Sequence, residues 1–324
     1  MNDTAPDAAP ARANVPARLQ RSRREAATRP GDGLKAIGLM LLALTLFSGL
    51  DASAKYLATR SDLPMIQIVW ARFVGQFLLM LSILSALPLS ALFGTRKLGW
   101  ELVRSLLMAA TTAFNFLALQ QLRLDQTVTV IFLGPLIVAL LAGPLLGEWV
   151  GWRRLAAISV GFVGILIAVR PGINLHPAFA YAFGAVAAFS LFMLLTRYLA
   201  AYDRPLTMLF YSILLGTFGL APFALWEWVW PQSLGQWLLL AALGTLGGIG
   251  HYLFIHAYRL APAPVIAPFL YLQLLTMVGF GYAVFGEVPD LWTIAGSVVI
   301  IGSGIYLIHR ERVTRTPIQP IDPI

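Results

Sequence analysis

The sequence predicts an all-α polytopic membrane protein with ten transmembrane helices in two inverted five-helix repeats. Of the 324 residues, 58% are hydrophobic and only 12% are charged, whereas soluble domains carry about 25% charged residues. Long apolar runs of about 20 residues recur along the chain, which is the length that crosses the hydrocarbon core of a bilayer. A motif near the middle of the chain also returns near its end. Lipid must therefore surround most of this chain.

The apolar runs predict the positions of the spans. They are too long and too uniformly apolar for transmembrane strands, which are about 10 residues with alternating polarity, so helices are expected. The connections between them are short. We expect the ten spans at residues 34–58, 64–87, 101–121, 125–146, 152–170, 177–199, 205–226, 235–258, 263–286 and 290–308.

Basic residues predict the orientation of the spans. Residues 1–33 are rich in Ala, Pro and Arg without apolar periodicity, which indicates a disordered basic tail rather than a secretory signal peptide. With this tail in the cytoplasm, most of the 23 lysines and arginines fall on the cytoplasmic side. The second tail, residues 311–324, then also lies in the cytoplasm. The net charge of +8 is thus interpreted as a topology signal, not as nucleic-acid binding.

Two similar stretches indicate the internal repeat. They read GPLLGEWVGWRRLAAISVGFVGILIAVR from Gly143 and GYAVFGEVPDLWTIAGSVVIIGSGIYLIHR from Gly281. Each has a Gly-Glu pair at a span end, a polar turn with Trp, and a small-residue-rich span that closes on Arg. The glutamates, Glu148 and Glu287, are 139 residues apart. A weaker echo pairs Lys55-Tyr56-Leu57 with Arg197-Tyr198-Leu199.

The odd number of spans in each repeat has a geometric consequence. Two halves with five spans each, residues 34–172 and 173–310, must be inverted relative to one another. Glu148 then lies at the cytoplasmic face and Glu287 at the outer face, so they cannot form a catalytic pair. We interpret them as span-end residues that cap or gate each half. Inverted repeats are typical of carriers that alternate around a site near the midplane, although duplication of a packing unit without transport would leave the same pattern.

Several motifs resemble a known family. The paired Gly-Glu repeats are joined by FSGLDASAKYLA in the first span, IVWARF in the second, and AYRLAPAPVIAPFLYLQLL before the ninth. Together they resemble the drug/metabolite transporter superfamily, specifically its EamA-type ten-helix carriers. The resemblance implies two EamA repeats, a cavity between them and a location in the bacterial cytoplasmic (inner) membrane. Its members include carriers of riboflavin, S-adenosylmethionine and amino acids.

Charged residues inside the spans are the first candidates for a site, because a charge at membrane depth is costly. Asp51 lies ~10 Å and Arg72 ~13 Å from the outer ends of their spans, at 1.5 Å per residue. An Asp51–Arg72 or an Asp51–Lys55 pair is therefore possible, either at a site or as a structural ion pair that joins two helices. We expect Lys55 itself to extend to the outer interface.

Five uncharged or titratable side chains complete the candidate set. Asn115 can bond a substrate or another helix, and Trp70 and Tyr271 could stack on a planar substrate. His251 titrates in the physiological range, although a hydrogen-bonded packing histidine is the commoner alternative. Gln273 follows the proline-rich start of the ninth span, where kinked helices often place a binding site.

The sequence therefore predicts a carrier for a small organic metabolite, possessing no catalytic residues, cofactor or metal site. Riboflavin or a similar planar metabolite, taken up and coupled to protons, is the leading hypothesis, and export of amino acids or other metabolites is the alternative. A lipid-modifying membrane enzyme would need a cluster of acids, histidines or a nucleophile, and a channel would need rings of charge. The chain has no cysteine. Both a monomer and a homodimer fit the sequence.

Overall fold

The computed structural model describes residues 32–84, 93–146, 152–170, 176–199, 202–260 and 267–313. Every regular element in these ranges is helical. In the first half the helices are α2 (Asp32–Arg60), α3 (Met65–Leu84), α5 (Leu98–Gln121), α6 (Leu124–Ile131), α7 (Gly134–Leu146) and α8 (Trp152–Val169). In the second half they are α9 (Phe179–Leu199), α10 (Pro205–Leu214), η1 (Leu215–Gly219), α11 (Ala221–Trp226), α12 (Leu234–Leu260), η2 (Ala267–Leu272), α14 (Gln273–Phe280), η3 (Gly281–Phe285) and α15 (Leu291–Val313).

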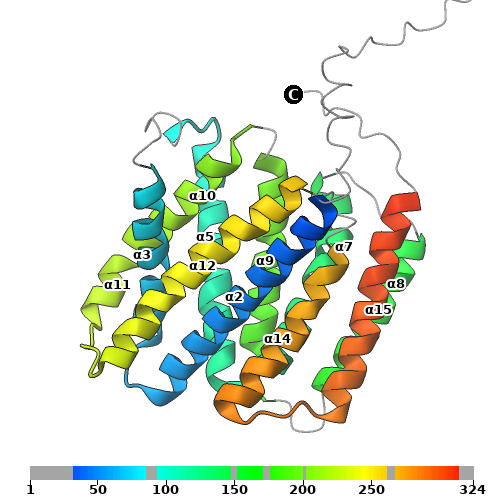
Figure 1. The fold of residues 1–324 in the computed structure, drawn as a ribbon. Coiled ribbons are helices and arrows are strands. Elements are labelled where there is room, and N and C mark those ends of the chain that lie inside the picture. Colours follow the sequence, from blue (N-terminus) through cyan, green and yellow to red (C-terminus); the bar gives the residue numbers. More distant parts are fainter. Residues whose placement is uncertain are drawn as a thin grey trace, which may run out of the picture.

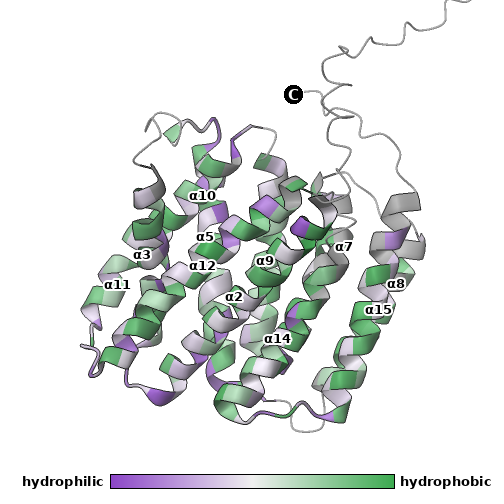
Figure 2. Ribbon diagram, in the orientation of Figure 1, coloured by the Kyte–Doolittle hydropathy of each residue, from purple (hydrophilic) through white to green (hydrophobic). Residues whose placement is uncertain are grey.

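The surface of this bundle suits lipid rather than water. Six of the described helices are long and apolar enough to cross a membrane, and shorter apolar helices lie beside them. Figure 2 shows hydrophobic residues along the lengths of the helices, while hydrophilic residues gather toward the helix ends and the connections. The chain is therefore a multi-pass α-helical membrane protein, as the sequence predicted. The total of ten spans stays a prediction.

Three of the expected spans are interrupted, and proline explains two of the breaks. The span expected at 125–146 divides into α6 and α7, where the Leu133 N–H bonds the Val130 carbonyl at 3.0 Å in a tight turn before Gly134-Pro135. The span expected at 205–226 contains the π-helix η1, which is followed by Pro222 without an N–H to donate. The span expected at 263–286 begins within residues outside the described ranges and continues as η2, α14 and η3.

The packing of the helices has the symmetry that two equivalent halves would produce. If α2 corresponds to α9 and α5 to α12, the contact of α2 with α12 should be mirrored by one between α9 and α5, and both are extensive. The α8–α15 contact joins equivalent elements of the two halves, and the α6–α14 contact joins the fourth expected span to the ninth. In Figure 1, α12 runs beside α2, α15 beside α8, and the first residues of α2 and the last of α15 lie at the same end.

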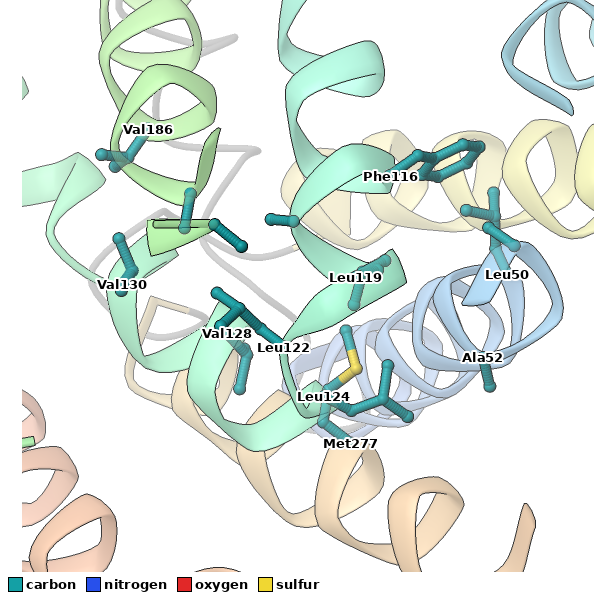
Figure 3. Packing of buried hydrophobic residues seen from close by; sticks show 14 of the residues in the cluster. Leu50, Ala52, Phe116, Leu119, Leu122, Leu124, Val128, Val130, Val186 and Met277 are labelled. Atoms are coloured by element: carbon teal, nitrogen blue, oxygen red, sulfur yellow. The ribbon is translucent and has the colours of Figure 1, made fainter. Parts of the chain in front are cut away.

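The main hydrophobic core lies where the halves meet. It joins Leu50 of α2, Phe116 and Leu119 of α5, Leu124 of α6 and Met277 of α14, each 3% exposed or less. Figure 3 shows Leu124 and Met277 next to each other, with α5 side chains above them. This core fixes the positions of α2 and α5, which carry most of the candidate site.

A close backbone approach between α3 and α12 predicts a large effect of small substitutions. A Cβ atom on Gly75 of α3 would lie 2.7 Å from the Gly244 Cα of α12, and one on Gly244 would lie 2.2 Å from the Gly75 Cα. Since backbone cannot move aside cheaply, we expect Gly75→Ala and Gly244→Ala each to cost about 1–3 kcal/mol of stability. Thermal unfolding in detergent measures this cost.

Gly279→Ala in α14 is the matched control for these glycine variants. A Cβ atom there meets nothing within 4 Å, and alanine favours a helix over glycine. We therefore expect Gly279→Ala to melt at or above the wild-type temperature. Equal melting of all three variants would show that the α3–α12 contact tolerates separation.

Candidate functional site

Five polar side chains from four helices converge inside the bundle. We call them the polar cluster: Asp51 of α2, Arg72 of α3, Thr112 and Asn115 of α5, and His251 of α12. The Asn115 amide Nδ2 donates to Asp51 Oδ1 at 3.1 Å, and the Arg72 guanidinium Nη1 donates to the Thr112 hydroxyl. Asp51 is 8% exposed and Thr112 is 2% exposed. The structure thus brings together four of the side chains that the sequence singled out, and adds Thr112.

The arrangement within the polar cluster differs from a simple ion pair. Among the described residues, Asp51 forms no ion pair with Arg72 or with Lys55. Instead each charge is held by a neutral side chain of α5, and Thr112 and Asn115 lie one helical turn apart on one face. The charges of Asp51 and Arg72 still act on one another electrostatically. The geometry therefore places an acidic and a basic side chain on neighbouring helices, each bonded to a neutral side chain of α5.

Two buried nitrogen atoms of the polar cluster have no partner within the described part of the chain. They are Nε of Arg72 and Nε2 of His251. Their surroundings are aromatic, because the Arg72 guanidinium lies 5.8 Å from the Phe73 ring centre and the His251 ring meets Phe47 edge to face at 4.9 Å. A hydrogen-bonding atom without a partner in apolar surroundings costs free energy.

Trp70 contacts the segment that follows α10. Its indole Nε1 donates to the Thr217 carbonyl of η1 at 2.7 Å, and its ring meets Trp228 edge to face at 5.9 Å. Trp70 is thus anchored to the segment from α10 to α11. Trp226 is 90% exposed and Trp230 is 68% exposed, as expected for aromatic residues at a membrane interface.

The two remaining predicted residues stand at the start of the ninth span. Tyr271 belongs to η2, but its side chain lies outside the described part, so the proposed stacking of Trp70 and Tyr271 on one substrate stays a prediction. Gln273 is the first residue of α14 and is half-buried. One turn further on, the Thr276 and Ser48 hydroxyls are 2.6 Å apart and connect α14 with α2.

Lys55 contradicts its expected position. It is 6% exposed and does not extend to the interface. Its Nζ donates to the Leu122 carbonyl at 2.7 Å and pairs with the Glu287 carboxylate, which also accepts from the Leu124 N–H at 3.1 Å. A carbonyl and a carboxylate from neighbouring segments hold the ammonium more favourably than a move to water would. Glu287 therefore pairs with Lys55, in addition to its position at a span end. Glu148 lies outside the described residues.

A second ionic contact lies beside Lys55 at the same end of the bundle. Asp290, just before α15, accepts from Arg170 Nη2 at 2.9 Å and from the Thr293 N–H at 2.6 Å, and lies 3.8 Å from Arg123. Burial alone would raise the pKa of Asp290, but the Thr293 bonds and the two guanidinium charges outweigh it and lower the pKa. Asp290 therefore stays ionised and links the two halves.

A buried ion pair at the opposite end of the bundle was missed by the sequence analysis. Arg104 is 3% exposed and pairs with the fully buried Glu101 at 3.0 Å. Arg104 also donates to the Met208 carbonyl and to the Ser212 hydroxyl of α10. The spacing of Glu101 and Arg104, three residues apart on one helix, was the available signal.

The described residues do not favour a metal centre. No group of three or more His, Cys, Asp or Glu side chains within them could hold an ion. The polar cluster offers hydrogen bonds and opposite charges, which suit reversible binding of an organic molecule.

Comparisons with known proteins agree with this fold. The model of the EamA-like transporter family matches twice, at residues 34–170 and 176–310. The chain is 28% identical over 280 residues to the S-adenosylmethionine uptake transporter of Rickettsia prowazekii, covering 86% of this chain and 94% of the relative. It is 28% identical over 276 residues to the riboflavin transporter of Vibrio cholerae, with 84% and 92% covered.

Two further matches extend the comparison. The pseudopaline exporter CntI of Pseudomonas aeruginosa is 26% identical over 284 residues, with 85% of this chain and 96% of the relative covered. A solved crystal structure superposes with a TM-score of 0.56 at 18% identity, and covers 87% of this chain and 99% of that one. At this identity the second match shows a shared fold alone.

Proposed function

This chain belongs to the EamA-like transporter family, and we propose that it is a carrier that moves a small organic metabolite across the cytoplasmic membrane by alternating access. Its curated relatives are named as transporters. Alternating access requires no covalent step, only a substrate affinity that differs between an inward-open and an outward-open state.

The observation that carries this proposal is the polar cluster. Charged, amide and imidazole side chains from α2, α3, α5 and α12 meet within apolar helices, and two buried nitrogen atoms there lack partners among the described residues. Polar groups at this depth by default mark a substrate or ion pathway. The cluster is thus the proposed substrate site.

The proposed mechanism uses the two halves, residues 34–172 and 173–310, as inverted units with both tails in the cytoplasm. The mirrored packing of α2 on α12 and α9 on α5 supports this arrangement. A rocking motion between the halves would open the polar cluster to one side at a time. The Lys55–Glu287 and Asp290 contacts join the halves at the outer end and would have to separate when that end opens.

The substrate is the finer part of the proposal. Relatives are named for S-adenosylmethionine uptake, riboflavin transport and pseudopaline export. Uptake of a planar metabolite and export of a metabolite are therefore the two activities to test. Metabolite profiling of a strain with and without the gene tests the proposal directly, together with growth of a riboflavin auxotroph at limiting riboflavin. A profile without any gene-dependent change inside or outside the cells would contradict a carrier, and no rescue would remove riboflavin.

Proton coupling adds a prediction for Asp51. If Asp51 carries a proton during the cycle, Asp51→Asn should abolish the dependence of uptake on a pH gradient, and the substrate exchange that the variant retains should not change with pH. Asp62→Asn, at an exposed position after α2, is the control and should transport normally. Transport that ignores the pH gradient and is unaltered in Asp51→Asn would remove proton coupling through this residue.

A further inference from the structure

We propose that Glu101 of α5 and Asp203, which lies just before α10, share one proton, and that this proton holds the two halves of the chain together at that end of the bundle. Neither residue belongs to the polar cluster. The proposed orientation places this end in the cytoplasm. The proposal therefore assigns a proton-binding site that is separate from the proposed substrate site.

The first argument is a buried oxygen atom of Glu101 that lacks a donor. Glu101 is 0% exposed, and its Oε2 accepts from Arg104 Nε at 3.0 Å. Its Oε1 has no hydrogen-bond partner among the described residues. An acceptor that is removed from water without a new partner costs free energy. A donor is therefore expected at Oε1.

The second argument is that the neighbouring group is another acid. The Asp203 carboxyl is 6% exposed and interacts directly with that of Glu101. Asp203 is held in this place, because its Oδ1 accepts from the Arg96 N–H at 3.1 Å and its Oδ2 accepts from the Thr95 hydroxyl. Two carboxyl groups that share a site do not both ionise, and one retains its proton. That proton is the donor that Glu101 Oε1 otherwise lacks.

The third argument is the balance of charge. With both carboxyls ionised, Glu101, Asp203 and Arg104 would together carry one net negative charge, and a shared proton makes the group neutral. Arg104 is 3% exposed, and its Nη2 donates to the uncharged Met208 carbonyl and Ser212 hydroxyl. A buried charge without compensation is strongly unfavourable. One proton thus satisfies both the hydrogen bonding and the charge of the site.

The surrounding groups do not supply this proton. Tyr211 of α10 interacts with both carboxyls, but its hydroxyl donates to the Phe93 carbonyl at 3.2 Å. On α3, Arg72 lies with the polar cluster and bonds Thr112. The other charged or titratable groups described near this end are exposed or half-buried: Arg96, Lys97, Tyr198, Tyr202 and Arg204.

The position of the proton gives it a structural role. Glu101 and Arg104 belong to the first half of the chain, and Asp203 and α10 belong to the second. While the proton is bound, a Glu101–Asp203 hydrogen bond adds to the bonds of Arg104 with α10. When the proton passes to water, two negative charges repel one another across the same interface, where the dielectric is low. The halves then separate more easily at this end.

Infrared difference spectroscopy of the full-length protein in detergent detects the proton directly, because a protonated carboxyl and a carboxylate absorb at different frequencies. Raising the pH from about 5 to about 9 should convert one such carboxyl signal. Glu101→Gln and Asp203→Asn should each remove it, because the new amide donates a permanent N–H to the remaining carboxylate. Asp62→Asn, at an exposed position after α2, should keep it.

The same proton determines how stability depends on pH. Unfolded Asp and Glu lose their protons at about pH 4, whereas the folded pair keeps one at neutral pH, so the folded state binds more protons. Stability is therefore greatest at acidic pH and falls as the pH rises through the range in which the pair releases its proton. The equilibrium constant for unfolding should rise by at most about tenfold per pH unit. Reversible unfolding in mixed detergents measures this rise, and Glu101→Gln should lack it.

Spin labels measure whether the proton holds the halves together. The chain has no cysteine, so labels can be attached at Leu98→Cys and Arg204→Cys, which are both exposed. The distance between the labels should lengthen between about pH 5 and about pH 9. In a Glu101→Gln background the distance should stay constant over this range.

Each result supports or overturns the proposal without any measurement of uptake. An infrared signal that persists in Glu101→Gln overturns the shared proton, and so does equal pH dependence of unfolding in this variant and the wild type. Stability that follows the sodium concentration instead of pH also overturns it, because Oε1 would then bind a metal cation. Label distances that do not change with pH overturn the role in joining the halves. If Asp203→Asn fails to fold, Glu101→Gln decides, because it leaves the bonds of Asp203 in place.

Discussion

Arg104→Met is expected to destabilise the protein by about 3–5 kcal/mol, the cost of leaving a buried charge without its partner. Glu101 is fully buried, and its Oε1 already has no partner among the described residues. Arg104 supplies its counter-charge and also reaches the Met208 carbonyl and the Ser212 hydroxyl on α10. Its loss would therefore leave a buried carboxylate unpaired and separate α5 from α10. Thermal unfolding of the purified protein in detergent measures the loss.

The double variant Glu101→Gln/Arg104→Met separates charge from packing. Replacement of both members of a buried ion pair is often close to neutral, whereas removal of one member is strongly destabilising. We therefore expect the double variant to melt well above Arg104→Met. Equal melting temperatures for the single and double variants would show that the α10 contacts, and not the charge of Glu101, account for the effect.

Most of the fold was predictable because lipid imposes a simple rule on the sequence. Each backbone polar group must bond within its own segment, so apolar length predicts a helix, and the expected bounds at 177–199 and 235–258 agree with α9 and α12 within a few residues. Prolines indicated kinks in the fourth and ninth spans, but the points at which the helices are interrupted were not predicted. The length of an apolar run does not indicate where the helical turn tightens, as at Phe132, or widens, as at Leu215. Proline and tertiary packing decide those points.

The polar cluster was largely predictable for the same reason. A charge or amide inside an apolar run is costly, so Asp51, Arg72, Asn115 and His251 stood out by depth alone. Hydropathy does not reveal partners, however. The sequence allowed an Asp51–Arg72 ion pair, whereas α5 supplies neutral partners to both. Lys55, near a span end, was wrongly expected to reach the interface. Its partner Glu287 is 232 residues away in the sequence, at the end of another span, and hydropathy does not bring the two together.

Lys55→Glu and Glu287→Lys are each expected to abolish transport, because each brings two like charges together at a buried junction of both halves. The Lys55 ammonium lies 5.0 Å from the Phe285 ring centre and bonds the Leu122 carbonyl as well as Glu287. Charge reversal on one side replaces an attraction with a repulsion in a region of low dielectric. Substrate uptake into proteoliposomes measures the loss, and surface labelling confirms that the variants reach the membrane.

The exchanged double variant tests whether this pair closes the outer end. Lys55→Glu/Glu287→Lys restores the attraction but cannot accept the Leu124 N–H at position 287, so we expect partial recovery of transport, above either single variant. Neutral Lys55→Met/Glu287→Gln should restore stability without the charge attraction. If it transports as well as the exchanged variant, the pair serves packing alone.

The repeat extends this prediction to the opposite face. Arg197 corresponds to Lys55 in the weaker echo, and Glu148 is the glutamate of the first Gly-Glu motif, which corresponds to Glu287. The side chains of Arg197 and Glu148 lie outside the described part. If the halves are inverted equivalents, these two residues form the matching contact at the cytoplasmic end. Arg197→Glu and Glu148→Arg should then each abolish transport, and the combined exchange should recover it in part. Full activity of both single variants would contradict the equivalence, because a carrier that opens to alternate sides needs a closing contact at each end.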